Sequence, residues 1–235
     1  MCHNIDAINQ RCEIIRRWFI SVTVITLLLL LPCFSGCLYG VSGSGNLVAG
    51  QFNYSDFNNI EVSNVFEVDI SQSDSYSIDI TSDDNIMEYI IIDRSGDILR
   101  IGLKLGYSYR SITAVAKINM PDISRFVLSR ASSGIINDFA AAGNINIDVS
   151  GASSLTLSDL ACADIGIEVS GASNMSLESF ITTDAGVNIS GASTAVVNTE
   201  GTPDAEISGA SNFQYIGNPE LGDISVSGAS DFKKK

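Results

Sequence analysis

The chain has 235 residues, with 13 Lys+Arg against 27 Asp+Glu, a formal net charge of −14 and one histidine, His3. This acidic balance argues against nucleic acid and against an anionic membrane face as partners, because both carry the same sign of charge. With so few histidines and cysteines, the sequence holds no zinc-binding pattern and no Ser-His-Asp or Cys-His catalytic arrangement beyond its first residues.

Residues 1–36 differ from the rest of the chain. A basic region ending at Arg17 precedes the uncharged apolar run WFISVTVITLLLLLP at 18–32, and small residues come after it. This order predicts an export signal. A transmembrane anchor is the alternative, but Pro32 and Gly36 interrupt the run before the ~20 residues that a spanning helix needs. In both cases the basic flank stays inside, so the remainder is expected outside the cytoplasm.

The segment FSGC at 34–37 resembles a lipoprotein signal box, which makes Cys37 the candidate for lipidation. Residues 38–45, LYGVSGSG, predict a flexible continuation, so that 37–45 would tether the domain to its lipid anchor. Without the leader the net charge is about −15 and the remaining cysteines are Cys37 and Cys162. Cys162 is expected to behave as a small buried hydrophobe.

Residues 46–128 are β-rich without a regular repeat. The stretch FNNIEVSNVFEVDISQSDSYSIDITSDD gives three alternating runs separated by Ser, Asp and Asn turns. EYIIIDRSGDILRIGLK predicts two strands around a turn, and ITAVAKINMPDISRFVLS completes the section. No Pro- or Gly-rich linker separates this section from the later residues, so 46–235 is expected to be a single β-domain.

A short motif, SGAS, recurs at 150–153, 170–173, 190–193, 208–211 and 227–230, after a degenerate copy, SRAS, at 129–132. Apolar and polar residues alternate before and after each copy, which is the period of half-buried strands. Three short straight stretches in about 20 residues predict one turn of a β-solenoid stacked at the ~4.8 Å inter-strand spacing, with regular coils over 129–235. Antiparallel hairpins are the alternative arrangement.

The motif is expected to form a stacked corner and not a reactive site. Gly151 and its equivalents would take a positive φ that a side chain resists. Ala152 and its equivalents would fit a corner with room for one methyl group. The serine hydroxyls, starting with Ser150, would bond along the column or to backbone groups of the turn.

An acidic residue recurs just before the first strand of the later coils: Asp164, Asp184, Asp204 and Asp223. One interpretation is a calcium-binding or catalytic stripe. The other, which we favour, is a set of solvated turn starters, because aspartate is common in turns and the calcium-binding repeat G-G-x-G-x-D is absent. The terminal FKKK at 232–235 is expected to blunt the open edge of the last coil.

The succession FNNIEVSNVFEVDISQSDSYSIDITSDDN, GDILRIGLK, INMPDISRFVLSRAS and serial SGAS units resembles the putative auto-transporter adhesin, head-GIN domain family. The resemblance runs over about 57–230. It implies a right-handed parallel β-helix-like fold, export or lipid anchoring at a prokaryotic surface, and a role in adhesion with no established catalytic residues. Arg130 stands where the repeat has glycine, so that corner is expected to differ in shape.

Together these patterns predict an all-β, right-handed parallel β-helix-like solenoid with about 20-residue coils and a less regular N-terminal section. The predicted function is non-enzymatic binding or adhesion at the cell surface, with the membrane as partner through a lipid anchor and a surface glycan or protein as ligand. No catalytic, cofactor-binding or metal-binding residue is predicted. The alternatives are a polysaccharide-active lyase or hydrolase on the same scaffold, and a purely structural envelope protein.

The anchoring prediction is tested by Cys37→Ala. Loss of the lipid acceptor should release the protein from membranes, because the acyl group is the expected anchor. The measurement is the distribution of the protein between membrane and soluble fractions. Unchanged retention in the membrane would contradict the assignment of Cys37.

Overall fold

The computed structural model describes residues 40–139 and 143–235, without the side chains of 159–163. The predicted export signal 1–36 and the candidate lipidation residue Cys37 lie outside the described residues. Of the described residues, Gly40 and Gly106–Ser108 belong to one compact unit, and Val41–Leu105 with Tyr109–Lys235 form the other, which contains the repeats. Within the described part, no helix is long and apolar enough to cross a membrane.

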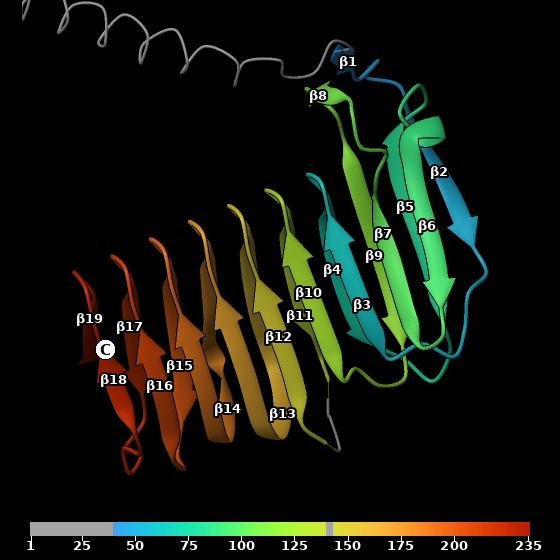
Figure 1. Ribbon diagram of the computed structural model, residues 1–235. Helices are drawn as coiled ribbons and strands as arrows, with labels where there is room; N and C mark the ends of the chain where they lie inside the picture. The colour runs from blue at the N-terminus through green and yellow to red at the C-terminus, as the bar shows by residue number, and fades with distance from the viewer. Residues whose placement is uncertain (1–39, 140–142) are drawn as a thin grey trace, which may run out of the picture. The chain divides into compact units, whose positions relative to one another are not determined.

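The protein is all-β, as the sequence predicts, and its helical content among the described residues is one 3-10 turn (Figure 1). The elements are β1 Gly40–Ser42, β2 Leu47–Phe52, β3 Asn59–Ser63, β4 Glu67–Gln72, β5 Ser77–Asp83, η2 Met87–Tyr89, β6 Ile90–Ser95, β7 Ile98–Leu103, β8 Ser108–Arg110, β9 Ala114–Met120, β10 Arg125–Ser129, β11 Ser133–Asn137, β12 Ile145–Val149, β13 Ser154–Val169, β14 Asn174–Ile189, β15 Thr194–Thr199, β16 Pro203–Ile207, β17 Asn212–Ile216, β18 Ile224–Val226 and β19 Asp231–Lys234.

The repeats pair in parallel, and the register follows the SGAS motif. We call layer A the strands that precede the motif: β3, β10, β12, the second halves of β13 and β14 (165–169 and 185–189), β16 and β18. Layer B contains the strands that come after it: β4, β11, the first halves of β13 and β14, β15, β17 and β19. Both sets of pairs are parallel throughout, so the hairpin alternative is wrong for the repeats. Figure 1 shows the successive strands side by side.

A third stretch joins layer B back to layer A, as the three-part repeat predicts, but it is paired in part of the chain only. Ala161 pairs with Ile181 and Cys162 with Thr182, so β13 and β14 run without a break from one layer to the other. In the next repeat, β15 ends at Thr199 and β16 begins at Pro203. The side chain of Cys162, predicted to be buried, is among those not described.

The N-terminal section continues both layers and then changes direction. In layer A, β3 pairs in parallel with β7, and β6 lies antiparallel to β7. In layer B, β4 pairs in parallel with β9, then β5 and β2 continue the layer in antiparallel pairs. These antiparallel strands explain why the first section lacks the 20-residue period of the repeats.

The core consists of the inward residues of the alternating strands. Ile147, Ile167 and Val187 lie in one register column of layer A and are at most 4% exposed. Leu155 and Met175 form the corresponding start of a column in layer B. Because successive residues of a strand point to opposite faces, the same register that buries these side chains sends their neighbours to solvent.

The glycine of each motif is required by conformation and by space. Gly171 has φ +79°, a region that side chains resist, and a Cβ there would lie 2.4 Å from the carbonyl oxygen of Gly151. The corners also bond directly: the amide of Ala172 donates to the carbonyl of Gly151 at 2.7 Å, and Ala192 donates to Gly171 at 2.8 Å. The predicted positive φ is therefore confirmed.

The prediction for Ala152 is wrong, because the alanine of the motif is exposed and fills no confined space. The corner turns its second and third residues outward and returns inward at its fourth residue. The buried column therefore consists of the serine at the fourth position of each motif. Its members Ser132, Ser153, Ser173, Ser193 and Ser211 are at most 2% exposed.

Hydrogen bonds link the buried serines along the stack. The amide of Ser153 donates to Oγ of Ser173 at 3.3 Å, and the same bond recurs from Ser132 to Ser230. The hydroxyl of Ser153 in turn donates to the carbonyl of Ser150 at 2.8 Å, which closes its own corner. The predicted bonding of hydroxyls along the column is confirmed for this serine.

The corner at SRAS differs from the others, as expected. Arg130 and Ala131 both have positive φ, 59° and 61°, and the equivalent turn between β3 and β4 has the same pair of conformations at Asn64 and Val65. These two earlier corners therefore share one geometry, and the glycine corners from Gly151 onward have another.

The expectation of a flexible tether does not hold for residues 40–45. They contain β1, and the amide of Gly45 donates to Asp83 Oδ1 at 2.7 Å. The other carboxylate oxygen accepts from the amide of Thr113, also at 2.7 Å. These two bonds to Thr113 and Gly45 hold the pKa of Asp83 below its usual value, since they favour the charged carboxylate.

Gly171→Ala should lower the free energy of unfolding by about 2–4 kcal/mol, through the left-handed backbone and the contact with Gly151. Gly186→Ala is the matched control, because a Cβ there meets nothing within 4 Å and its φ is not in the left-handed region. It should change stability by less than about 0.5 kcal/mol. Thermal unfolding followed by circular dichroism measures both, and equal effects would contradict the close-stacking explanation.

Candidate binding face on layer A

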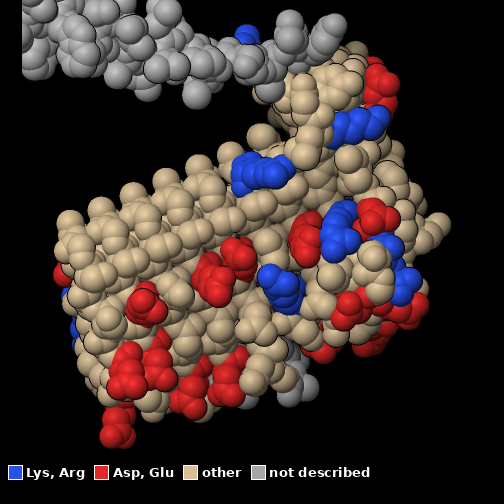
Figure 2. All heavy atoms as spheres, in the orientation of Figure 1, with Lys and Arg blue, Asp and Glu red and all other residues tan. Residues whose placement is uncertain are grey.

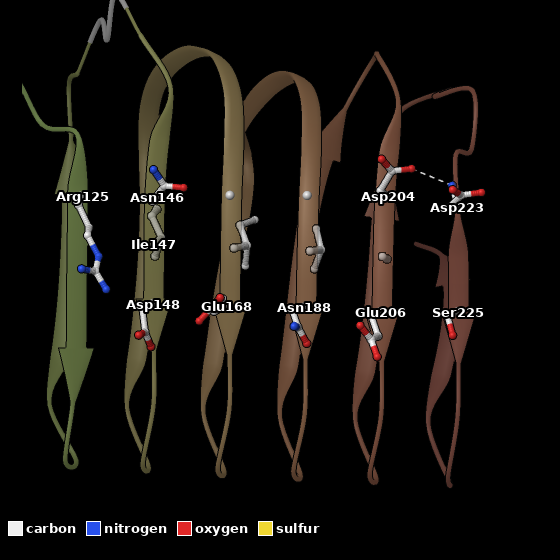
Figure 3. Close-up of a pocket in the computed structure, with 15 residues that line it drawn as sticks. Arg125, Asn146, Ile147, Asp148, Glu168, Asn188, Asp204, Glu206, Asp223 and Ser225 are labelled. Atoms are coloured by element: carbon white, nitrogen blue, oxygen red, sulfur yellow. Dashed lines mark hydrogen bonds between the residues drawn. The ribbon is translucent and has the colours of Figure 1, made fainter.

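The outward residues of layer A form two parallel rows across the repeats (Figure 3). The strand register sets both rows, since each position pairs with its equivalent one repeat later. The first row contains Arg125, Asn146, Gly166, Gly186, Asp204 and Asp223. The second, which we call the acidic row, contains Asp148, Glu168, Asn188, Glu206 and Ser225. Its members alternate with the buried residues of the core.

A hollow of about 710 Å³ lies over these rows. Its middle is low because Gly166 and Gly186 have no side chains, so the inward residues Ile167 and Val187 also line it. Arg125 borders it at the β10 end, where its side chain extends toward the level of Asp148 (Figure 3). The hollow is open to solvent along its length and lies across the strands.

The charge on this face is unevenly distributed. Over the later repeats the charged side chains visible on this face are mostly acidic, whereas toward β3, β7 and β10 arginines and lysines lie among acidic side chains (Figure 2). At the basic end, Arg100 Nε lies 2.8 Å from Glu61 Oε2 and forms an ion pair with it. Among the described side chains, no ion pair of this kind involves Asp148, Glu168 or Glu206.

Asp148 is the member of the acidic row whose charged form is disfavoured by its surroundings. Partial burial raises its pKa above the usual value of 3.8, and the neighbouring Glu168 raises it further. Arg125 acts in the opposite direction and is the smallest of the three effects. Asp148 and Glu168 lie beside each other on adjacent parallel strands, since they are register partners. The face therefore carries carboxylates in excess of the cations available to neutralise them.

The four recurring aspartates do not form one column. Asp164 pairs with Asp184, but Asp204 pairs with Gly186 and not with Asp184. Asp204 and Asp223 therefore lie in the first row, whereas Asp164 and Asp184 lie two residues before the first-row positions of their strands. Asp184 Oδ1 accepts from the amide of Thr202 at 2.6 Å, and Asp204 Oδ1 from the amide of Asp223 at 2.7 Å. The two donors lie 18 and 19 residues further along the chain, just before the next strand of layer A, so these carboxylates link neighbouring repeats.

Chemically, the face can hold a ligand by hydrogen bonds and by attraction of positive charge. The described residues contain no group of three or more His, Cys, Asp or Glu side chains that could hold a metal ion. Carboxylates, amides and hydroxyls recur at the inter-strand spacing of about 4.8 Å, which suits an extended ligand lying across the strands.

The acidic row was not predicted from the sequence, although its signal is present there. Each member stands two positions before the first serine of the motif, as Asp148 stands before Ser150. The row could not be recognised from the sequence, because a single outward polar residue in an alternating strand is expected in any strand that faces solvent. The glycines at 166 and 186 carry a second signal, since glycine in a strand marks a place where something can approach the backbone closely.

The family model described as putative auto-transporter adhesin, head GIN domain matches residues 56–181 and 167–219, well over half of the chain. The chain belongs to this family. The predicted resemblance is therefore confirmed, and the match includes most of the hollow. No curated protein matches the sequence.

Solved structures share the head GIN fold at low identity. A putative adhesin from Bacteroides fragilis has a TM-score of 0.69 at 16% identity, covering 83% of this chain and 100% of its own. Putative adhesins from Parabacteroides distasonis and Parabacteroides merdae have TM-scores of 0.55 and 0.54 at 17% and 20% identity. They cover 83% and 84% of this chain and 100% and 99% of their own. At these identities the likeness shows the fold alone.

Asp148→Asn should stabilise the head GIN domain at neutral pH. A raised pKa means that the folded state disfavours the charged carboxylate, so stability falls as pH rises from the ordinary pKa through the raised one. Removing the charge should raise the melting temperature at pH 7 by about 1–2 °C, since the side chain is partly exposed. The gain should vanish near pH 3, where both forms are neutral. A gain of equal size at both pH values would contradict the electrostatic explanation.

Proposed function

We propose that this head GIN domain is a non-enzymatic binding module at the cell surface, and that the hollow of layer A binds an extended surface glycan. The observation that carries the proposal is the hollow itself: an open depression across the strands, floored by Gly166 and Gly186 and bordered by Asp148, Glu168 and Asn188. Hydroxyl-rich polymers are bound by such rows of carboxylates and amides through hydrogen bonds. The acidic row favours a glycan that also carries amino groups, through charge complementarity.

The proposal includes a location and an anchor. The family description as an adhesin supports exposure outside the cytoplasm. The export signal at 1–36 and the lipidated Cys37 remain predictions, and they agree with that location. In this arrangement the lipid on Cys37 holds the domain at the membrane, and the binding face is presented to other surfaces.

We further propose that 46–235 forms a single β-solenoid, right-handed and parallel, with one SGAS corner per coil. The parallel register between residues about 20 apart supports it, as does the bonding of each glycine corner to the next. A stack of this kind is stiff because every repeat packs against both neighbours. Stiffness suits a binding surface, since little conformational freedom is lost when the ligand binds.

A second candidate function is a polysaccharide-active hydrolase or lyase. One observation favours it: Asp148 and Glu168 are neighbouring carboxylates, and the pKa of one is raised by burial and by the other. Carbohydrate-cleaving enzymes use pairs of carboxylates whose pKa values are pushed apart. A structural envelope protein without a ligand is the remaining alternative.

Gly186→Tyr should abolish binding to glycans, because a large side chain at this position fills the hollow, and its Cβ would meet no atom within 4 Å. We expect affinity to fall at least about tenfold on a glycan array. Ser176→Tyr is the matched control, since Ser176 is an outward residue of the same strand, β14, in layer B. It should leave binding unchanged.

The same preparations separate the alternatives. Release of reducing sugar that is lost in Glu168→Gln would establish the enzymatic candidate and overturn the non-enzymatic one. Absence of glycan binding by the unaltered protein would overturn the glycan proposal. Capture of a surface protein that Gly186→Tyr abolishes would then assign the same face to a protein ligand.

A further inference from the structure

The core is left uncovered at the β18–β19 end. Val226 takes the place of the fully buried Ile207 one repeat earlier, yet it is 45% exposed. Phe232 takes the place of the fully buried Phe213 and is only partly buried. Its ring lies 5.5 Å from that of Phe213 and 5.2 Å from that of Tyr215, so the aromatic column of the core ends at an open surface.

The backbone at this end is also open. The register pairs β18 with β16 and β19 with β17, and neither strand has a partner on its far side in the described part of the chain (Figure 1). Both layers end at the same repeat, which makes this end level. At the other end, layer A finishes with β6 while layer B continues through β5 to β2. Unpaired strand edges favour pairing with another strand.

We propose that the β18–β19 end pairs with the same end of a second copy of this chain, in a two-fold symmetric dimer. A two-fold axis perpendicular to the layers places β18 against the partner β18 and β19 against the partner β19. Rotation by 180° reverses the strand direction, so both pairs are antiparallel. A single axis therefore satisfies both open edges at once, which is the self-complementarity that an isologous interface requires.

The side chains of β19 fit this pairing. In an antiparallel pair, directly opposite residues point to the same face, so an inward residue must oppose an inward residue. Centring the pair on Phe232 places the two Phe232 side chains opposite each other in the core. It also places Asp231 of each copy opposite Lys233 of the other, on the outer face. These outward residues are then of opposite charge in both symmetric positions.

Asp231 and Lys233 are available for this exchange. Within one copy Lys233 Nζ lies 2.8 Å from Asp231 Oδ2, and the two side chains are 51% and 60% exposed, respectively. Replacing this ion pair within one copy by ion pairs between two copies costs little free energy, because an exposed ion pair contributes little to stability. The terminal lysines were predicted to discourage edge pairing. In this dimer they would discourage only the shifted registers, because those place Asp231 opposite Asp231 or Lys233 opposite Lys233.

The interface is small, since each copy contributes one repeat. Stable complexes bury about 1,600 Å² in total, so we expect a weak dimer that depends on concentration. Restriction of both copies to one surface would raise their local concentration and favour it. A head-to-tail contact fits these edges less well, because at the opposite end layer A finishes with β6 while layer B continues to β2.

The experiment uses two oppositely charged variants of the full chain in nonionic detergent, with mass measured by sedimentation. Asp231→Lys gives a copy with Lys at both outward positions, and Lys233→Asp gives one with Asp at both. Each variant alone should dimerise at least about tenfold more weakly than the unaltered chain, through like-charge repulsion. An equimolar mixture should restore dimerisation, since all opposing pairs are then of opposite charge.

The controls separate this interface from other causes. Gln214→Asp makes a comparable change one strand inside the edge, at the register partner of Lys233, and should leave dimerisation unchanged. Two chains sharing a detergent micelle would not respond to charge at 231 and 233. A monomeric unaltered chain up to about 100 µM, dimers that persist in both variants, or open-ended oligomers would each overturn the proposal.

Discussion

The close contact between successive glycine corners is the constraint on which the rest of the structure depends. The amide after each glycine bonds to the glycine carbonyl of the repeat before it, at 2.7–2.8 Å. A methyl group at Gly171 would lie 2.4 Å from the oxygen of Gly151, so the corners from Gly151 onward can stack in this way only where a hydrogen atom replaces the side chain. One repeated residue therefore sets both the turn and the distance between repeats.

This contact also sets the register of both layers. Because side chains alternate between the faces of a strand, a register fixed at the corner aligns inward residues with inward residues over every repeat. The buried serine column closes each corner from the inside, through bonds such as Ser153 to Ser173. The outer faces have the same order, because outward residues alternate with the aligned inward ones. The members of the acidic row line up across the repeats because the buried residues next to them in each strand are held in register.

Much of the fold could be predicted from the sequence, because repetition reports it directly. The SGAS period and the alternation of residues such as Ile147 and Ile167 with polar neighbours predict stacked strands and their buried positions. The binding face could be predicted only in part. The aspartates at 184 and 204 repeat along the chain yet bond to the backbone of the next repeat, whereas Asp148 and Glu168 carry no repeat of one residue type and form the face.

The sequence by itself determined which residues are inward, where the chain turns and why glycine is needed there, since these depend on local conformation and on a period along the chain. Only the tertiary structure decided which outward residues share a row. Repeats of 18, 19 and 20 residues shift the alignment by different amounts, and the register shows that Asp204 joins Gly186 and not Asp184. It also decided that Ala152 faces solvent and that Gly45 is held by Asp83, because both outcomes depend on neighbours distant in the chain.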